Sequence, residues 1–250
     1  MPTIRNIKLT LEYDGTNFNG WQMQARSKRT VQGEIEKVLS RILKKKTAVI
    51  GSGRTDSGVH AKAQTANFKT VSTMTPVQIL KALNALLPED LAVVAAEEVP
   101  LNFHARYSVK SKIYRYAILN RESRSPLSRH ISLFYRRYLN LHRMRKEAQV
   151  LIGRKDFKSF QATDFALSEK NTIRTIKKIQ IRKSGDFIYI DTEANGFLYK
   201  MVRNIVGTLL EIGSGKRPVR SMKDILSKKN RQDAGPTAPA QGLCLLEVRY

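Results

Sequence analysis

Two kinds of hydrophobic spacing alternate along the first half of the sequence. Residues 7–13 alternate apolar and polar side chains, which predicts a half-buried strand. After Thr30, a residue type that caps helices, apolar side chains recur at helical spacing up to Leu43. Further predicted elements are strands at 47–52, 63–68 and 91–99 and a helix that begins at the capping box Thr75–Gln78. This order of elements favours an α+β fold in which helices cover one face of a mainly antiparallel sheet.

The second half of the chain follows a similar plan. Its predicted elements are strands at 112–119, 172–182, 187–193 and 243–250, helices at 141–152 and 198–212, and a short helix after Ser221. The boundary falls near residues 106–110, where no Pro-, Gly- or Ser-rich linker marks it. We therefore expect two similar α/β halves, residues 1–108 and 109–250, that share one sheet.

One polar segment, residues 155–172, is predicted to be a long surface loop. It carries Phe157, Phe160 and Phe165 among basic residues. Aromatic and basic side chains interleaved in this way suit RNA bases, and the alternative is that the aromatic rings anchor the loop in the core.

The charge of the chain is strongly one-sided. It contains 45 Lys and Arg against 21 Asp and Glu, a formal net charge of +24, and the basic residues recur along the whole length. A folded basic surface of this kind favours a nucleic acid partner, with an anionic membrane surface as the weaker alternative. No run of 18 apolar residues and no apolar signal-peptide core is present, so we expect a cytoplasmic protein that does not enter a membrane.

Cysteine and histidine usage argues against a metal or a disulfide. Cys244 is the single cysteine, and the four histidines stand far apart with no cysteine at metal-ligand spacing. We predict neither a structural zinc nor a catalytic metal.

One loop places a carboxylate beside a guanidinium between glycines. The segment Gly51–Ala61 contains Arg54 and Asp56. Glycine relieves backbone crowding, so such a segment can turn sharply and another molecule can approach it closely. The local alternative is an ordinary turn, because Asp-Ser-Gly is also a good turn sequence. A nucleotide phosphate loop is excluded, since Val59 follows Gly58 where Lys and then Ser or Thr would be needed.

Two residues of the second half are candidates for the same site. Alternation within 112–116 places Tyr114 and Tyr116 on one strand face, where a tyrosine can stack on a base and hydrogen-bond at once. In the helix predicted at 198–212, Arg203 falls on the side opposite the apolar stripe. That side also carries Lys200, Asn204, Gly207 and Glu211. The plain alternatives are a packed strand aromatic for Tyr114 and a solvated helix residue for Arg203, and spacing alone places neither beside Asp56.

Several motifs occur in a fixed order along nearly the whole chain. They include Tyr13-Asp14-Gly15-Thr16, Gly20-Trp21-Gln22, Gly53-Arg54-Thr55-Asp56 with Gly58-Val59-His60-Ala61, Phe103-His104-Ala105-Arg106, Lys112-Ile113-Tyr114-Arg115-Tyr116, Arg174-Thr175-Ile176, Met201-Val202-Arg203-Asn204 and Ala234-Gly235-Pro236-Thr237-Ala238-Pro239-Ala240. Through these motifs the sequence resembles the TruA-type tRNA pseudouridine synthases. It departs from them chiefly at Lys155, where a histidine is expected, and at Cys244, where an aromatic residue is common.

The resemblance implies the pseudouridine synthase fold and a cofactor-free isomerase. Its substrate would be tRNA, with uridine converted to pseudouridine at positions 38, 39 and 40 of the anticodon stem-loop, and the enzyme would be a homodimer. Asp56 corresponds to the catalytic aspartate, Arg203 to the arginine that pairs with it, and Tyr114 to the tyrosine that contacts the target base. Arg54 occupies the position expected to hold or replace the flipped nucleotide.

Two other functions remain open from the sequence. The first is a basic RNA-binding protein that keeps the fold without turnover, although such a protein would not need Asp56, Tyr114 and Arg203 together. The second is a base-excising glycosylase, which also flips its target and uses an acidic residue but would release free uracil.

Overall fold

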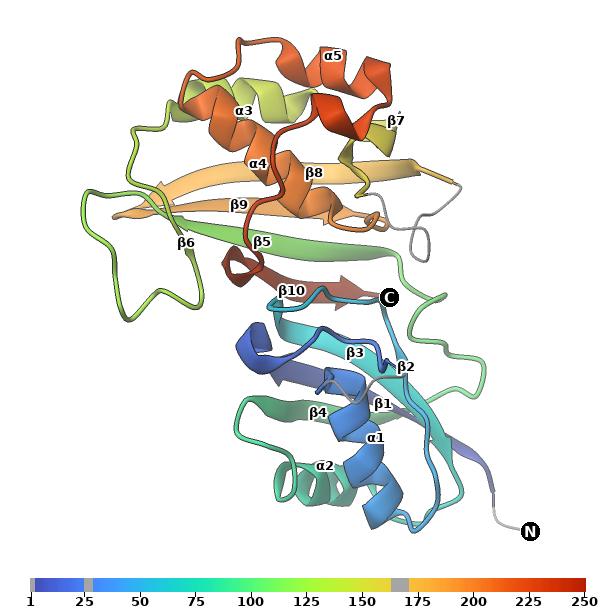
Figure 1. Cartoon of the computed structure of the whole chain (residues 1–250). Helices are drawn as coiled ribbons and strands as arrows, with labels where there is room; N and C mark the ends of the chain where they lie inside the picture. Colours follow the sequence, from blue (N-terminus) through green and yellow to red (C-terminus); the bar gives the residue numbers. More distant parts are fainter. Residues whose placement is uncertain (1–2, 25–28, 163–170) are drawn as a thin grey trace. The chain divides into compact units, whose positions relative to one another are not determined.

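The computed structural model describes residues 3–24, 29–162 and 171–250. The chain divides into two units, one formed by Met1–Lys110 with Leu245–Tyr250 and the other by Ser111–Cys244 (Figure 1). The sequence-based boundary at 108/109 lies two residues before the end of the first segment, but it leaves the last six residues in the second half. Strand β10 (Leu243–Arg249) belongs to both units.

Unit 1 is a small antiparallel sheet with two helices. It contains, in chain order, β1 (Arg5–Tyr13), the one-turn helix η1 (Gly15–Asn17), α1 (Val31–Ile42), β2 (Ile50–Gly51), β3 (His60–Thr70), α2 (Pro76–Asn84) and β4 (Leu91–Val99). Strand β1 is central and pairs antiparallel with β3 and β4, while the short β2 pairs with β3. Helix α2 packs against β4 and against α1. The predicted order of strands and helices is confirmed, although the strand expected at 47–52 is reduced to two residues.

Local sequence explains the elements of unit 1. The alternation in β1 buries Ile7, Leu9 and Leu11 completely, as period-two spacing predicts. At the start of α1 the Thr30 hydroxyl accepts a hydrogen bond from the backbone N–H of Gly33, which confirms the predicted N-cap.

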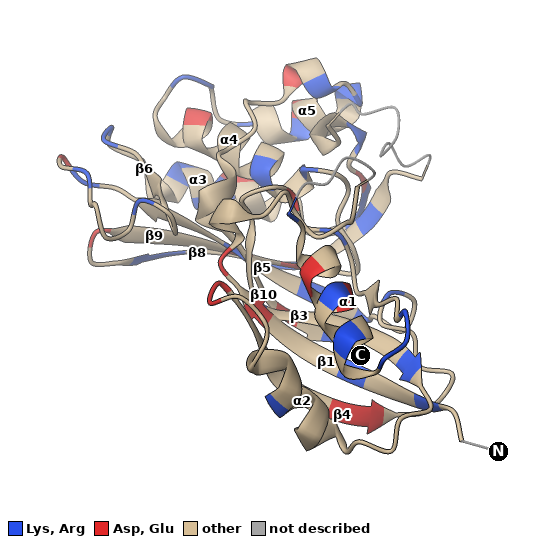
Figure 2. Ribbon diagram, turned by 60° about the horizontal axis from the view of Figure 1, so that its bottom comes forward, with Lys and Arg blue, Asp and Glu red and all other residues tan. Residues whose placement is uncertain are grey.

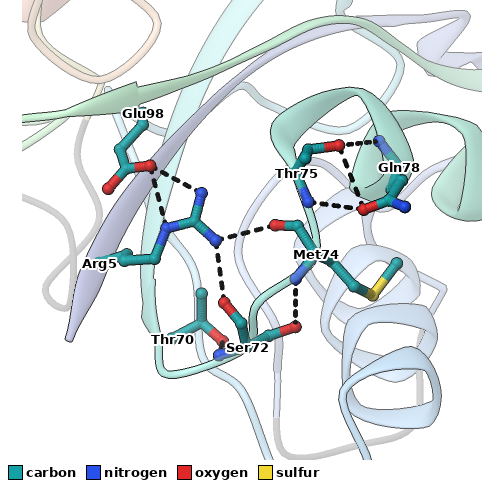
Figure 3. Close-up of polar contacts among 7 residues, drawn as sticks. All are labelled: Arg5, Thr70, Ser72, Met74, Thr75, Gln78 and Glu98. Carbon is teal, nitrogen blue, oxygen red and sulfur yellow. Dashed lines mark hydrogen bonds and ion pairs between the residues drawn. The ribbon is translucent and has the colours of Figure 1, made fainter. Parts of the chain in front are cut away.

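The capping box of α2 is also confirmed (Figure 3). The Gln78 side chain accepts from the backbone N–H of Thr75 at 2.8 Å, and the Thr75 hydroxyl accepts from the N–H of Gln78 at 3.3 Å. Just before the helix, the Arg5 guanidinium donates to the carbonyl oxygens of Ser72 and Met74 while it pairs with Glu98. One arginine of the central strand thereby fixes the chain that leads into α2.

Unit 2 carries its helices against a second group of strands. It contains β5 (Ser111–Leu119), β6 (Leu133–Phe134), α3 (Leu141–Gln149), β7 (Gly153–Asp156), η2 (Lys158–Phe160), β8 (Ile173–Ser184), β9 (Phe187–Ala194), α4 (Met201–Gly213), α5 (Ser221–Lys228), η3 (Arg231–Asp233) and η4 (Ala240–Gly242). The strand order is β5-β9-β8-β7, with antiparallel pairing between neighbours, and β6 runs parallel to β5. Helix α3 packs on β8 and on α4, and α4 packs on β5. Mostly antiparallel strands flanked by helices confirm the predicted α+β class.

The segment predicted as a loop at 155–172 contains regular structure. Strand β7 pairs with β8 and η2 follows it, so the chain is held at the edge of the strands. Phe157 and Phe160 are completely buried, which supports the core-anchoring alternative for both rings. Phe165 lies outside the described residues.

Helix α4 begins later than predicted. Its first residue is Met201, because Lys200 adopts a left-handed conformation with φ of 56°, which lies outside the range of a right-handed helix. Within the described ranges, no helix of either unit is both long and apolar enough to cross a bilayer.

A carboxylate shared by two arginines ties three strands of unit 2 together. Asp191 on β9 stands opposite Arg115 on β5 and accepts two hydrogen bonds from its guanidinium, at 2.7 and 2.8 Å. Arg182 on β8 donates a third at 2.8 Å. Burial alone would raise the pKa of the Asp191 carboxyl, but the hydrogen bonds from both arginines outweigh it and hold that pKa below its usual value.

Replacing Asp191 by asparagine should make the free energy of unfolding of unit 2 less dependent on pH in the acidic range. Because the folded-state pKa is lowered, the carboxylate stabilises the fold above its unfolded pKa of about 3.9 and loses this effect as the pH falls through the folded value. Urea unfolding should show Asp191→Asn about 2 kcal/mol less stable at pH 7, a difference that shrinks steadily below pH 4. Asp186→Asn, which breaks the exposed pair with Arg121, is the control and should have little effect. An Asp191→Asn difference that stays constant with pH would contradict this account.

Candidate active site

Asp56 lies in the loop between β2 and β3 of unit 1, at the first position of a tight turn. The backbone N–H of Val59 donates to the Asp56 carbonyl oxygen at 3.2 Å, and Gly58 has a φ of +77°, which glycine adopts without strain. The Asp56 side chain is half-buried, and Arg54 is exposed. The predicted turn is therefore present, and it carries the candidate carboxylate of Asp56 at its first position.

The segment Tyr13–Gln22 holds this loop from the other side. The hydroxyls of Tyr13 and Thr55 form a buried hydrogen bond at 2.8 Å. The backbone N–H of Trp21 donates to the Thr55 carbonyl at 3.1 Å, which fixes the residue directly before Asp56. After Asp56, the N–H of Gly58 and the hydroxyl of Ser57 both donate to the Phe18 carbonyl, at 3.3 and 3.2 Å. Asp56 thus sits on backbone that is anchored on both sides.

Glycines allow this close packing of the two segments. Gly20 has a φ of +81°, and a Cβ there would stand 2.5 Å from the Thr55 carbonyl oxygen. Within the loop, a Cβ on Gly51 would overlap the indole of Trp21. The space made by Gly51 is therefore filled by the protein itself, which corrects the expectation that this glycine admits another molecule.

Arg54 is oriented by a chain of amide side chains. Its Nε donates to Gln22 Oε1 at 3.2 Å, and Gln22 Nε2 donates to Gln32 Oε1 at 2.8 Å. Gln32 in turn donates to Glu36 at 2.8 Å, so the chain ends on α1. An exposed guanidinium is thereby connected to a helix of unit 1.

Tyr114 of unit 2 is a packed strand aromatic, only 8% exposed. Its ring meets Phe197 edge to face, with centroids 5.1 Å apart and planes at 87°. Its cross-strand neighbour Thr192 carries a buried hydroxyl that has no hydrogen-bond partner within the described part of the chain. Tyr116, on the same face, is completely buried and donates from its hydroxyl to the Pro239 carbonyl at 2.8 Å.

Arg203 lies in the first turn of α4 and is half-buried. Its Nε donates to the Ala238 carbonyl at 2.7 Å, and the Ala238 N–H donates back to the Arg203 carbonyl at 3.1 Å. Asn204 and Gly207, which share this side of α4, are buried. The chain after α5 covers them, and Arg203 is a fixed side chain rather than a solvated one.

The candidate residues fall into two groups. Arg54 and Asp56 share one loop of unit 1, while Tyr114 and Arg203 belong to unit 2. Among the described residues, no three His, Cys, Asp or Glu side chains gather so that they could hold a metal ion.

Comparison with known proteins identifies the class to which these features belong. A family model described as tRNA pseudouridine synthase matches residues 10–108 and 148–250, which include Asp56 and Arg203. The chain belongs to this family. The resemblance seen in the motifs is therefore confirmed, and so is the predicted enzyme class, an isomerase of the pseudouridine synthase type.

Curated relatives of this synthase match it from end to end. "tRNA pseudouridine synthase A" of Thermoanaerobacter sp. (strain X514) is 46% identical over 99% of this chain and 100% of its own length. Proteins of the same name from Clostridium acetobutylicum and Geobacter sp. (strain M21) are 45% and 44% identical over 99% of the chain, and 100% and 99% of their own lengths. A solved Cbf5-Nop10-Gar1 complex aligns with a TM-score of 0.37 and 11% identity over 95% of this chain and 57% of that one, which is too low to support a conclusion.

The candidate site of this synthase is supported by residues whose contacts the sequence did not reveal. Tyr13, Gly20 and Trp21 entered the sequence argument as motif residues alone, yet Tyr13 and Trp21 bond Thr55 directly before Asp56, and Gly20 packs against the same backbone. Spacing could not have shown this, since more than thirty residues separate them from the loop. Their occurrence in the same set of motifs as Asp56 was the available signal.

Proposed function

We propose that this synthase isomerises uridine to pseudouridine at positions 38, 39 and 40 in the anticodon stem-loop of tRNA, with Asp56 as the nucleophile. The observation that carries the proposal is the fixed turn, which presents a half-buried carboxylate from backbone anchored on both sides. A catalytic group must occupy the same position in every reaction cycle, and backbone anchored in this way holds the carboxylate in place.

The reaction needs few groups because it is an isomerisation. The N1–C1′ bond of uridine breaks, the uracil turns, and a C5–C1′ bond forms. The proton leaves C5 and a proton is gained at N1, so no oxidant, water or cofactor is consumed. A carboxylate can add to the ring or to the sugar carbon, or can stabilise the electron-poor sugar while the base is detached.

The other candidate residues suit supporting roles in this chemistry. The resemblance implies that Arg203 pairs with the catalytic aspartate, and such a pairing would fix the orientation of the carboxylate. Tyr114 would stack on the target uracil and assist removal of the C5 proton. Arg54, exposed and oriented by Gln22, would hold or replace the nucleotide that leaves the stem. Flipping that nucleotide costs a few kcal/mol, and contacts to tRNA elsewhere would offset it.

The charge distribution supports tRNA as the partner. Figure 2 shows Lys and Arg on helices, strands and loops of both units, with Asp and Glu less frequent. Each contact between a phosphate group and a Lys or Arg side chain adds to the binding free energy, so a long RNA can bind such a surface tightly. The resemblance further implies a homodimer in which one subunit holds the body of the tRNA while the other presents the loop, and we expect it to work in the cytoplasm. Sedimentation at working concentration distinguishes the dimer from a monomer.

The proposal is tested with tRNA transcribed from uridine labelled with tritium at C5. We expect the purified protein, without added metal or nucleotide, to release tritium into water. Every base should stay attached to its ribose, so no free uracil should form. A matched tRNA with cytidine at positions 38, 39 and 40 should release none.

Each alternative gives a different result in the same assay. Tritium that stays in a tRNA bound by the protein would support the non-catalytic RNA-binding alternative. Release of free uracil would support a glycosylase. Tritium release from the cytidine-substituted tRNA would show that other uridines are the targets.

A further inference from the structure

The chain that follows α5 packs closely across α4. Residues 231–238 cross the side of the helix that carries Arg203 and Gly207, as the red segment near α4 indicates in Figure 1. A Cβ on Gly207 would overlap the carbonyl oxygen of Pro236, and one on Gly235 would stand 2.7 Å from the Cα of Thr208. The two backbones are therefore in direct contact, with no side chain between them.

Arg231 holds this segment through several hydrogen bonds at once. Its Nη1 donates to the carbonyl oxygens of Gly235 and Ala234, at 2.9 and 3.4 Å. Its Nη2 donates to Asn204 Oδ1 at 3.0 Å and to Thr237 Oγ1 at 3.2 Å. The Thr237 hydroxyl donates to the same Asn204 oxygen at 2.6 Å. One guanidinium thus joins the segment to a side chain of α4.

The acceptors of the hydrogen bonds from Arg231 indicate its structural role. Within the described residues, the groups that accept from Arg231 are neutral oxygens, and burial lowers the pKa of its guanidinium. Asn204 is completely buried and donates from Nδ2 to the Phe160 carbonyl at 2.7 Å. Arg231 therefore organises main chain and amide groups rather than neutralising a carboxylate.

The last residue of the segment, Ala238, orients the side chain of Arg203. The Ala238 carbonyl accepts from Arg203 Nε, and the next carbonyl, that of Pro239, accepts from the Tyr116 hydroxyl. Ala238 consequently lies between two anchors, with Arg231 and Asn204 before it and Tyr116 after it. A shift of the segment at Thr237 would move the oxygen that orients the Arg203 guanidinium.

We propose that Arg231 is a positioning residue for Arg203, because it fixes the segment whose Ala238 carbonyl orients the Arg203 guanidinium. The inference rests on the proposed role of Arg203 in catalysis. Since a displacement of about 1 Å at a catalytic group can cost about a hundredfold in rate, the loss of Arg231 should slow turnover without weakening the tRNA complex.

The first test replaces Arg231 by methionine in the full-length protein. Arg231→Met should lower kcat for tRNA by about 10- to 100-fold and leave the dissociation constant for tRNA within about threefold. The matched control is Arg217→Met. Arg217 is also half-buried and also bonds α4, through Glu211, and the start of the segment, through the Asp233 carbonyl, but its bonds do not reach residues 234–238. It should keep kcat within about threefold of the unchanged protein.

The second test asks whether Arg231 acts through Arg203. In an Arg203→Lys protein the guanidinium to be oriented is absent, so adding Arg231→Met should reduce kcat by less than about threefold. An equal loss in both backgrounds would overturn the proposal, as would an Arg231→Met protein with unchanged kcat. If the unchanged protein released no tritium from tRNA, the proposed function itself would fail, which is a different result.

A milder pair of variants covers the case in which Arg231→Met does not fold. Thr237→Val removes the hydroxyl that bonds Asn204 and accepts from Arg231, whereas Thr237→Ser keeps it. The valine variant should lose several times more kcat than the serine variant at similar melting temperatures. Equal kcat values in the two folded variants would overturn the proposal.

Discussion

Asp56→Asn should lower the turnover of tRNA uridine by roughly 10⁴-fold or more, because the amide keeps the shape of the side chain but is not a nucleophile. The loop contacts described for Thr55, Ser57 and Gly58 use backbone atoms and neighbouring hydroxyls, so the turn should persist. The dissociation constant for tRNA should change by less than about threefold, since phosphate contacts supply most of such an affinity.

The measurement is tritium release under single-turnover conditions, with tRNA binding followed separately. Glu89→Gln is the matched control, an exposed acid of the same unit, and should release tritium at the normal rate. An Asp56→Asn protein that retained more than a few per cent of the normal rate would exclude Asp56 as the nucleophile. Loss of tRNA binding in parallel with turnover would instead point to a damaged loop.

Gly207→Ala should destabilise unit 2 by about 3 kcal/mol, although the same change within a helix is ordinarily favourable. A Cβ at this position would overlap the Pro236 carbonyl oxygen, and that backbone is held by Arg231 and Thr208. Either α4 or the segment must move. Because Arg203 and Ala238 lie at this contact, kcat should fall as well.

Gly33→Ala in α1 is the control for this prediction. It is also a helical glycine, but the near atom is the Thr30 hydroxyl oxygen at 3.0 Å, so a Cβ requires a shift of only a few tenths of an ångström and meets no backbone. Chemical unfolding should show Gly33→Ala within about 1 kcal/mol of the unchanged protein. A Gly207→Ala protein as stable as Gly33→Ala would mean that the segment does not press on α4.

Local signals predicted most elements of this synthase. The Thr30 cap, the capping box at Thr75 and the alternation of β1 depend on residues close together in the sequence, and each is confirmed. The turn at Asp56 belongs to the same class. Its glycine supplies a backbone conformation that can be predicted from the residue type alone.

The burial of polar residues on α4 could not be predicted in this way. Asn204, Gly207 and Arg203 have the polarity of a solvent-facing side, but a segment more than twenty residues downstream covers them with main-chain groups. Hydrogen bonds to backbone leave no hydrophobic periodicity in the covering segment, so pattern analysis cannot detect it. The same limit applies to Tyr13 and Trp21, whose partners at Thr55 are distant in sequence.

The position of the last strand has a consequence for biosynthesis. Residues 245–250 belong to unit 1, where the Lys110 N–H donates to the Arg249 carbonyl and the Tyr250 hydroxyl donates to the Ala105 carbonyl. A ribosome makes these residues after it has made the whole of unit 2. The unit that carries Asp56 is therefore translated first and completed last, and its nascent strands must wait through the synthesis of more than a hundred residues before their final partner emerges.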